Sequence, residues 1–215
     1  MHAGLLADLV SALLPARCPG CGVRAEPVCT RCAAGMRPAP PAPPPAGIDA
    51  WVAAFAYEGV ARELVARLKY RNARAAVPWL GAIAAGVAQR RLYVPRVLDA
   101  PDVVTWPPTV AERRRGRGFD HAELLARVVS RRLGPTAESL LRRLDGSPQT
   151  GRSAAARRAG PRFAPIGACQ GRRVLVVDDV ATTGSTLSSC ARALKGGGAA
   201  SVVAVTVART PLPGR

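Results

Sequence analysis

The sequence is poor in lysine, aromatic and acidic residues, and each shortage limits what the protein can be. Only Lys69 and Lys195 are lysines, so arginine provides 29 of the 31 basic side chains in this 215-residue chain. Such a skew, together with abundant alanine, glycine and proline, is what a GC-rich genome produces. Part of the net charge of +17 therefore reflects codon usage. The nine aromatic side chains are too few to interleave with arginines as a stacking platform for single-stranded nucleic acid.

Histidines and long apolar runs are also scarce. His2 and His121 are the only histidines, and no Ser/His/Asp or Cys/His set for nucleophilic catalysis is evident. We expect His121 at the surface, at the start of a helix. Residues 1–14 place leucines on one helical stripe but have no basic leader region. We therefore expect no signal peptide, no membrane span and a cytoplasmic protein.

Four of the six cysteines form two C-x-x-C pairs, Cys18/Cys21 and Cys29/Cys32. Paired knuckles bring four thiolates within reach of one tetrahedral ion, and Zn2+ is the usual occupant. A redox dithiol would explain one knuckle but not the second, and disulfides are disfavoured without a secretion signal. The sequence therefore predicts a small structural zinc unit. Of the other two cysteines, Cys169 is expected in a loop and Cys190 on a helix as a small buried residue.

Residues 37–47 contain six prolines in eleven positions and predict an extended, semi-rigid spacer. It divides the chain into three parts. The expected parts are residues 1–36, with the amino-terminal helix and the four-cysteine unit, the linker 37–47, and a main domain over 48–215.

Strand-like and helix-like segments alternate along the main domain. This alternation predicts an α/β fold with a parallel sheet flanked by helices. The expected strands are 50–57, 102–106, 139–144, 174–177 and 201–208. The expected helices are 60–70, 77–92, one capped by Asp120 and Glu123, and one that begins near Leu187.

The most informative stretch runs from Val174 to Thr186. A buried apolar strand is followed by two adjacent acids, Asp178 and Asp179, and then by small hydroxylated residues around Gly184. Backbone N–H groups at a helix start bind phosphate oxygens, and small side chains allow close approach. The acids would repel a phosphate but suit a neighbouring diol, so a ribose 5-phosphate fits both halves. The alternative is a buried strand and a capped helix without a ligand.

This stretch resembles the 5-phosphoribosyl-1-pyrophosphate (PRPP) motif of type I phosphoribosyltransferases: a strand, two acids, then Thr-Thr-Gly-x-Thr. Other short motifs resemble the ComF (ComFC-like) family. In chain order these are the double cysteine knuckle, Tyr57-Glu58-Gly59, Leu68-Lys69-Tyr70, Trp106-Pro107-Pro108, Arg117-Gly118-Phe119, Ala122–Ala126, Gln149 and Arg157. The resemblance covers nearly the whole chain apart from the proline segment. Departures at Trp106, Asp120-His121 and Gly160 concern the acceptor side more than the PRPP side.

The resemblance implies a type I phosphoribosyltransferase-like site with PRPP and Mg2+ as ligands. Asp178 and Asp179 would hold the ribose hydroxyls. The 5-phosphate would lie on Ala181, Thr182, Thr183, Gly184, Ser185 and Thr186, and the pyrophosphate on Pro107 and Pro108. Arg113, Arg114 and Arg117 belong to a loop that we expect to be mobile and to close over the pyrophosphate. Lys69 is a further candidate, although a lysine at a helix end also suits the helix dipole. For Arg113, Arg114 and Arg117 the alternative is a solvated basic loop that takes no part in binding.

Two classes of function remain open. The first is a transferase that moves the 5-phosphoribosyl group to an unknown acceptor. The second is a non-enzymatic protein of DNA uptake that keeps a PRPP pocket, binds single-stranded DNA and works with a competence helicase-like partner. The basic character of the chain fits the second class. A homo-oligomer is left open.

Overall fold

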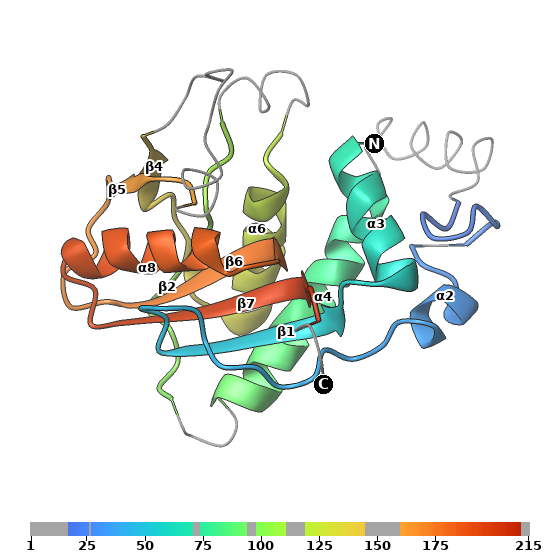
Figure 1. Cartoon of the computed structure of the whole chain (residues 1–215), viewed down its shortest axis with the longest axis horizontal. Helices are drawn as coiled ribbons and strands as arrows, with labels where there is room; N and C mark the ends of the chain where they lie inside the picture. The colour runs from blue at the N-terminus through green and yellow to red at the C-terminus, as the bar shows by residue number, and fades with distance from the viewer. Residues whose placement is uncertain are drawn as a thin grey trace, which may run out of the picture.

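The computed structural model describes residues 17–25, 27–70, 74–93, 98–110, 119–144 and 160–211 (Figure 1). Its centre is a five-stranded sheet in the order β1-β7-β6-β2-β3, in which every neighbouring pair is parallel. The strands are β1 (Ala50–Ala56), β2 (Val103–Thr105), β3 (Thr136–Ala137), β6 (Arg173–Ala181) and β7 (Ser201–Arg209). The predicted parallel α/β sheet is confirmed.

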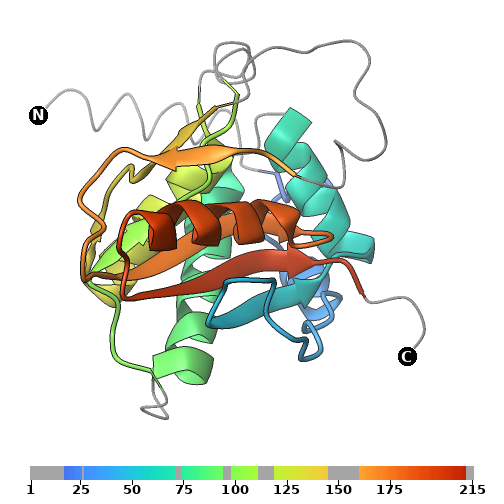
Figure 2. The same cartoon turned by 60° about the vertical axis from the view of Figure 1, so that its left-hand side comes forward.

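Helices cover both faces of this sheet. On one face lie α4 (Val77–Ala88), continued by a π-helical turn Gln89–Tyr93, and α6 (His121–Leu133). On the other face lies α8 (Ser185–Gly196), as Figures 1 and 2 show. Along β6, Leu175 and Val177 face α4 and α6, whereas Val174 and Val176 face α8. Burial on both faces explains why this strand is a continuous apolar run rather than an alternating one.

β6 is longer than the sequence predicted. The expected strand ended at Val177, but pairing with β7 continues through Asp178 opposite Thr206 to Ala181 opposite Arg209. The two acids therefore lie inside the strand, not after it. The neighbouring strand β7 supplies hydrogen-bond partners for the backbone beyond the apolar run. A local hydrophobic pattern does not reveal this neighbour, so it could not predict the longer strand.

A second, antiparallel sheet pairs β4 (Leu141–Arg143) with β5 (Phe163–Pro165) and lies against α8. β4 falls within the predicted strand 139–144. β5 was not among the predicted strands, because three residues that include a proline carry no detectable periodicity.

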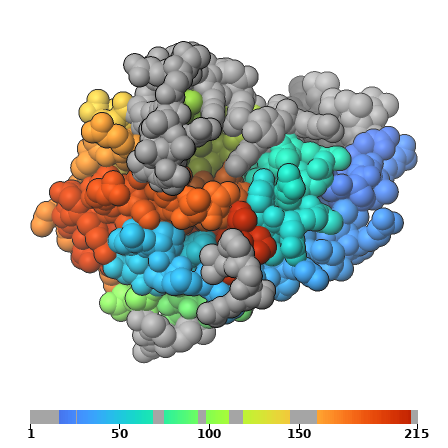
Figure 3. Space-filling view, viewed as in Figure 1, coloured from blue at the N-terminus to red at the C-terminus, as the bar shows by residue number. Residues whose placement is uncertain are grey.

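The cysteine unit packs on α3 (Gly59–Tyr70) at one end of the molecule (Figures 1 and 3). It contains the short helix α2 (Thr30–Ala34). Cys18, Val28, Cys32 and Met36 share a small core with Ala61 and Leu64 of α3. This contact joins the cysteine unit to the α/β body.

The proline segment, residues 37–47, runs along the outside of the sheet. The backbone N–H of Ala39 donates to the carbonyl of Ala54 at 3.0 Å, and the N–H of Ala56 donates to the carbonyl of Arg37 at 2.9 Å. The buried guanidinium of Arg209 donates to the carbonyl of Pro40 at 2.6 and 3.1 Å. The segment therefore contacts β1 and β7 directly, and the division of the chain at residues 36 and 47 stays a prediction.

None of the helices within the described ranges combines the length and the apolar character needed to cross a bilayer.

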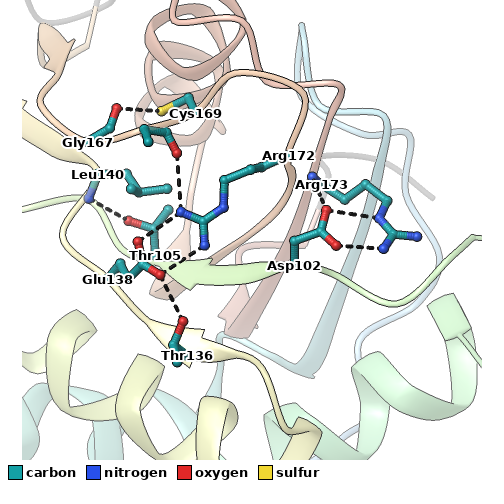
Figure 4. A network of polar contacts seen from close by, with 10 residues as sticks. Asp102, Thr105, Thr136, Glu138, Leu140, Gly167, Cys169, Arg172 and Arg173 are labelled. Carbon is teal, nitrogen blue, oxygen red and sulfur yellow. Dashed lines mark hydrogen bonds and ion pairs between the residues drawn. The ribbon is translucent and has the colours of Figure 1, made fainter.

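The amino-terminal edge of the sheet is held by two arginine–carboxylate pairs (Figure 4). Both nitrogens of the Arg172 fork donate to Glu138, each at 2.9 Å. Arg173 donates to Asp102 through its guanidinium at 2.6 and 3.1 Å and through its backbone N–H at 2.8 Å. Hydrogen bonds from these arginines lower the pKa of Asp102 and of Glu138 to about 2. The pairs tie β6 to β2 and to the segment after β3.

We expect acid to weaken the fold through these two carboxyls. Their pKa values are lower in the folded than in the unfolded chain, so their contribution is present above the ordinary values of 3.8 and 4.5 and is lost as the pH falls toward about 2. Urea unfolding at a series of pH values should show a steeper decline for the natural chain than for an Asp102→Asn/Glu138→Gln variant. Parallel profiles would contradict this assignment. Both side chains are more than a third exposed, so solvent screening keeps the difference modest.

Candidate functional site

The carboxyl ends of the parallel strands meet at one edge, where Figure 1 shows the arrowheads of β1, β6 and β7 together. In open α/β sheets this edge is where ligands bind. The loop Thr182–Gly184 leaves β6 here and leads into α8, whose first residue is Ser185. The predicted phosphate loop, Ala181–Thr186, is therefore one continuous strand–turn–helix unit at this edge.

Gly184 shapes the loop. It is the N-cap of α8 with φ +75° and ψ 0°, in the left-handed region that favours glycine. A Cβ built on it would lie 2.7 Å from Cγ of Pro45, so the proline segment reaches the loop and leaves no room for a side chain. Glycine has no side chain with which to cap the helix, and the hydroxyl of Thr183 accepts from the first backbone N–H of α8, that of Ser185. Backbone N–H groups at a helix start of this kind bind anions.

Hydroxyl groups surround this helix start. The Thr183 hydroxyl accepts from the backbone N–H of Ser185 at 3.4 Å and donates to the Ser185 hydroxyl at 3.1 Å. Thr182 and Thr183 are exposed, whereas Ser185 and Thr186 are half-buried. The loop combines backbone donors and rotatable hydroxyls, which is the chemistry that phosphate oxygens need.

Asp178 and Asp179 precede the loop and are nearly buried, at 9% and 8% exposure. One oxygen of Asp178 accepts from the backbone N–H of Asp179 at 2.8 Å. Because side chains alternate along a strand, Asp178 lies on the α8 face and Asp179 on the opposite face. The pair therefore spans both sides of the strand, rather than presenting two carboxylates side by side.

Arg143 of β4 lies on the α8 side of the main sheet, which the sequence did not indicate. Burial raises the pKa of the Cys190 thiol well above its ordinary value, the charge of Asp178 adds to the rise, and the charge of Arg143 opposes it. The charges of Asp178 and Arg143 therefore both affect the buried thiol of Cys190. Arg143 comes from the small β4–β5 sheet, and no local motif marks it in the sequence.

Pro107 and Pro108 follow β2, which pairs with β6, so they reach the same edge of the sheet. The next residue, Thr109, donates its backbone N–H to Asp120 at 2.7 Å. Asp120 also caps α6 by accepting from Ala122 at 3.1 Å, and burial raises its pKa despite these hydrogen bonds. Asp120 thereby closes the base of the loop that begins at Pro107. The predicted loop arginines, Arg113, Arg114 and Arg117, lie outside the described residues.

His121 is buried, and the prediction of a surface histidine was wrong. Its Nε2 lies 2.5 Å from the carbonyl oxygen of Leu68, and the Phe119 ring packs on it with centroids 4.8 Å apart. The burial comes from α3, whose carboxyl end meets the start of α6 across 53 positions of sequence. The backbone of Lys69 follows Leu68 at this point, whereas its side chain lies outside the described part of the structure.

The four cysteines of the two knuckles converge as predicted. The sulfur atoms of Cys18, Cys21, Cys29 and Cys32 all lie within 4.8 Å of one another, and those of Cys21 and Cys29 are 3.6 Å apart. Tetrahedral Zn2+ with Zn–S bonds of about 2.3 Å requires sulfur separations of about 3.8 Å. The donor set therefore fits a four-thiolate metal centre after small adjustments.

Backbone N–H groups stabilise the thiolate form of Cys18 in this cluster. The N–H groups of Gly20 and Cys29 each donate to Cys18 Sγ at 3.4 Å. Burial alone would raise the pKa of Cys18, but these and neighbouring hydrogen bonds outweigh it and lower the pKa to about 6. Burial and the adjoining thiols raise the pKa of Cys32 to about 12. A Cβ on Gly20 would lie 2.8 Å from Cys32 Sγ, so glycine is needed beside the cluster.

Cys190 is buried, as predicted, and Cys169 is buried as well; both lie apart from the four-cysteine cluster. Cys169 Sγ contacts the carbonyl of Gly167 at 3.5 Å, near the Arg172–Glu138 pair. Cys190 lies within α8. Both belong to the core on the α8 face of the sheet.

Several known proteins are similar to this chain. The DNA utilization protein YhgH of Escherichia coli O157:H7 is 35% identical over 120 residues, which are 53% of this chain and 52% of that protein. The YhgH of strain K12 is 34% identical over the same shares. The chain thus spans about half the length of these curated relatives. Glutamine PRPP amidotransferase from B. subtilis is 23% identical, with a TM-score of 0.43 over 63% of this chain and 26% of that one.

A family model also matches the chain. The model for the phosphoribosyl transferase domain covers residues 73–212, which is more than half of the chain. This range contains the strand–turn–helix unit with Asp178, Asp179 and Gly184. The chain therefore belongs to the phosphoribosyl transferase domain family.

Proposed function

We propose that this chain is a ComF-like protein that binds PRPP together with Mg2+ and transfers the 5-phosphoribosyl group to an acceptor. The observation that carries the proposal is the strand–turn–helix unit. Two nearly buried acids on β6 lead into a glycine-capped helix start surrounded by hydroxyls. Membership of the phosphoribosyl transferase domain family supports the choice of ligand.

In the proposed complex, the 5-phosphate lies on the loop from Ala181 to Thr186. Backbone N–H groups at the start of α8 and the hydroxyls of Thr182, Thr183, Ser185 and Thr186 donate to its oxygens. Asp178 and Asp179 accept hydrogen bonds from the ribose hydroxyls. Their burial excludes water, which strengthens these bonds relative to bonds made in open solvent.

The pyrophosphate end would lie toward Pro107 and Pro108. Asp120 holds the base of this loop through Thr109, and we propose that Arg113, Arg114 and Arg117 close over the pyrophosphate, with Lys69 nearby. Mg2+, held mainly by PRPP oxygens, would supply charge neutralisation on the leaving group. Positive side chains from the protein complete that neutralisation, and loop closure keeps water from competing with the acceptor.

Measuring pyrophosphate release tests this proposal. The full chain is incubated with PRPP, Mg2+ and a panel of purine and pyrimidine bases and small amines, and calorimetry records PRPP affinity in parallel. Acceptor-dependent release of pyrophosphate supports the transferase. Tight PRPP binding without release for any acceptor overturns the transferase and leaves a binding protein. Failure to bind PRPP overturns both.

A second candidate function is suggested by the curated relatives. YhgH is called a DNA utilization protein, and this chain carries a net charge of +17. We propose as the alternative a protein that handles single-stranded DNA and retains the PRPP pocket, acting with a helicase-like partner. Oligonucleotide binding that falls steeply with salt and persists with saturating Mg2+–PRPP supports this alternative. Absence of binding near physiological salt excludes it.

A further inference from the structure

A second pocket lies away from the phosphate loop, between α8 and the small β4–β5 sheet. It has a volume of about 450 Å³, within the range of about 300–1,000 Å³ typical of small-molecule sites. One wall is the face of α8 formed by Ser189, Arg192, Ala193 and Gly196, which follow helical spacing. The opposite wall comes from residues 144 and 162–165 beside and within β5. Figures 1 and 2 show β5 passing over α8.

Ser189 provides the first sign of a ligand. Its side chain is 3% exposed, it lines the pocket, and its hydroxyl has no hydrogen-bond partner among the residues that the structure describes. A buried hydroxyl without a partner costs stability, so such groups are rare in folded proteins and require an explanation. A bound molecule that accepts from or donates to this hydroxyl would supply the missing hydrogen bond.

Two arginines line the pocket. Arg162 and Arg192 both line it, and no carboxylate does so among its described residues. The two side chains come from opposite walls, and both are exposed. Guanidinium groups on two sides of an opening are suited to a phosphate, whose oxygens accept paired hydrogen bonds.

The rest of the lining is apolar and partly open. Leu144 is 47% exposed, which makes it one of the few large apolar side chains left at the surface of the described chain. Pro165 and Ala193 continue this surface, and the buried ring of Phe163 backs it. An apolar wall next to two cations fits a ligand with a weakly polar part and an anionic part.

We propose that this pocket binds a nucleotide. The phosphate lies between Arg162 and Arg192, the base rests on the apolar wall at Leu144 and Pro165, and the Ser189 hydroxyl completes its hydrogen bonding with the ligand. The same chemistry is offered by a free mononucleotide and by one unit of single-stranded DNA. Size, charge and the unpartnered hydroxyl thus point to one ligand class.

The pocket is separate from the proposed PRPP site, although both use α8. The phosphate loop adjoins the first turn at Ser185, whereas Arg192 lies seven residues further along the helix. At 1.5 Å per residue this is about 10 Å along the axis. The inference does not depend on phosphoribosyl transfer, and PRPP should not displace the nucleotide.

Calorimetry on the full chain tests the proposal with four deoxynucleoside monophosphates, their nucleosides, inorganic phosphate and a single-stranded oligonucleotide. A monophosphate should bind more tightly than its nucleoside or phosphate alone. Loss of one charged hydrogen-bonding group should weaken this binding about tenfold or more in Arg192→Gln and several-fold in Ser189→Ala. Tighter binding of the oligonucleotide than of the monophosphate would identify a DNA strand as the source, and the reverse order a free nucleotide.

Matched variants keep the result interpretable. Ser188→Ala changes the neighbouring serine of the same helix, and Arg131→Gln removes an exposed arginine on α6. Both should bind like the natural chain. An Asp178→Asn/Asp179→Asn variant should retain nucleotide binding even if PRPP binding is lost, which separates this site from the proposed function. Absence of monophosphate binding, equal effects in test and control variants, or complete competition by Mg2+–PRPP would overturn the proposal.

Discussion

Replacing both Asp178 and Asp179 by asparagine is expected to reduce the affinity for Mg2+–PRPP by about 100-fold or more. Each carboxylate is proposed to accept charged hydrogen bonds from ribose, and such bonds contribute about 1.5–3 kcal/mol each. Loss of two amounts to at least about 3 kcal/mol, which corresponds to a factor of about 100 in Kd. Isothermal titration calorimetry on the natural and variant chains measures the difference directly.

The same substitution should leave the fold in place. Asparagine has the same shape as aspartate, so the ladder between β6 and β7 and the packing on both faces of β6 remain. The thermal midpoint should therefore change little. Asp99→Asn, at the opposite edge of the sheet and largely exposed, is the control and should bind PRPP normally. Unchanged PRPP affinity in the folded double variant would remove the ribose assignment.

Removal of the metal is expected to have the second large effect. Apparent binding free energies of structural Zn2+ in small zinc units are about 10–16 kcal/mol at neutral pH, and this energy is coupled to folding. A strong chelator should therefore open residues 17–36, with loss of hydrogen-exchange protection there. Much of β6 and β7 should stay protected, because their core is formed with α4, α6 and α8. Metal analysis of the purified chain should find one Zn2+ per molecule.

The Cys32→Ser substitution tests the same zinc site by removing one of its four sulfur ligands. Cys32 is buried at the contact between the cysteine unit and α3, so losing its thiolate removes a ligand and leaves a hydroxyl in a small apolar core. We expect loss of zinc and a lower thermal midpoint. Cys169→Ser serves as the control, because Cys169 lies outside the four-cysteine cluster and should retain full zinc. Full zinc content in Cys32→Ser would show that this thiolate is not a ligand.

Local sequence patterns predicted those features that depend only on residues close together in the sequence. The apolar run before Asp178 formed a buried strand, Asp120 capped α6, and the two knuckles brought their four sulfurs together. In each case the deciding residues lie within a few positions of one another. The phosphate loop belongs to the same group, since strand, turn and helix start are contiguous.

Features that depend on distant partners could not be predicted in this way. The burial of His121 requires the carbonyl of Leu68, and the extension of β6 through the acids requires β7 beside it. Arg143 lies beside α8 because β4 pairs with β5, which had no recognisable pattern. Such contacts are set by strand order and helix packing, about which a single sequence carries little information.

The proline segment also determines how the sheet ends. An edge strand exposes unpaired backbone groups that can recruit another chain, and a long parallel sheet is vulnerable at both sides. Here the backbones of Arg37 and Ala39 form hydrogen bonds with the carboxyl-terminal half of β1. The prolines that follow have no N–H with which to bond a further strand. At the opposite side, β3 is only two residues long. Both margins of the sheet are therefore poor templates for edge-to-edge aggregation.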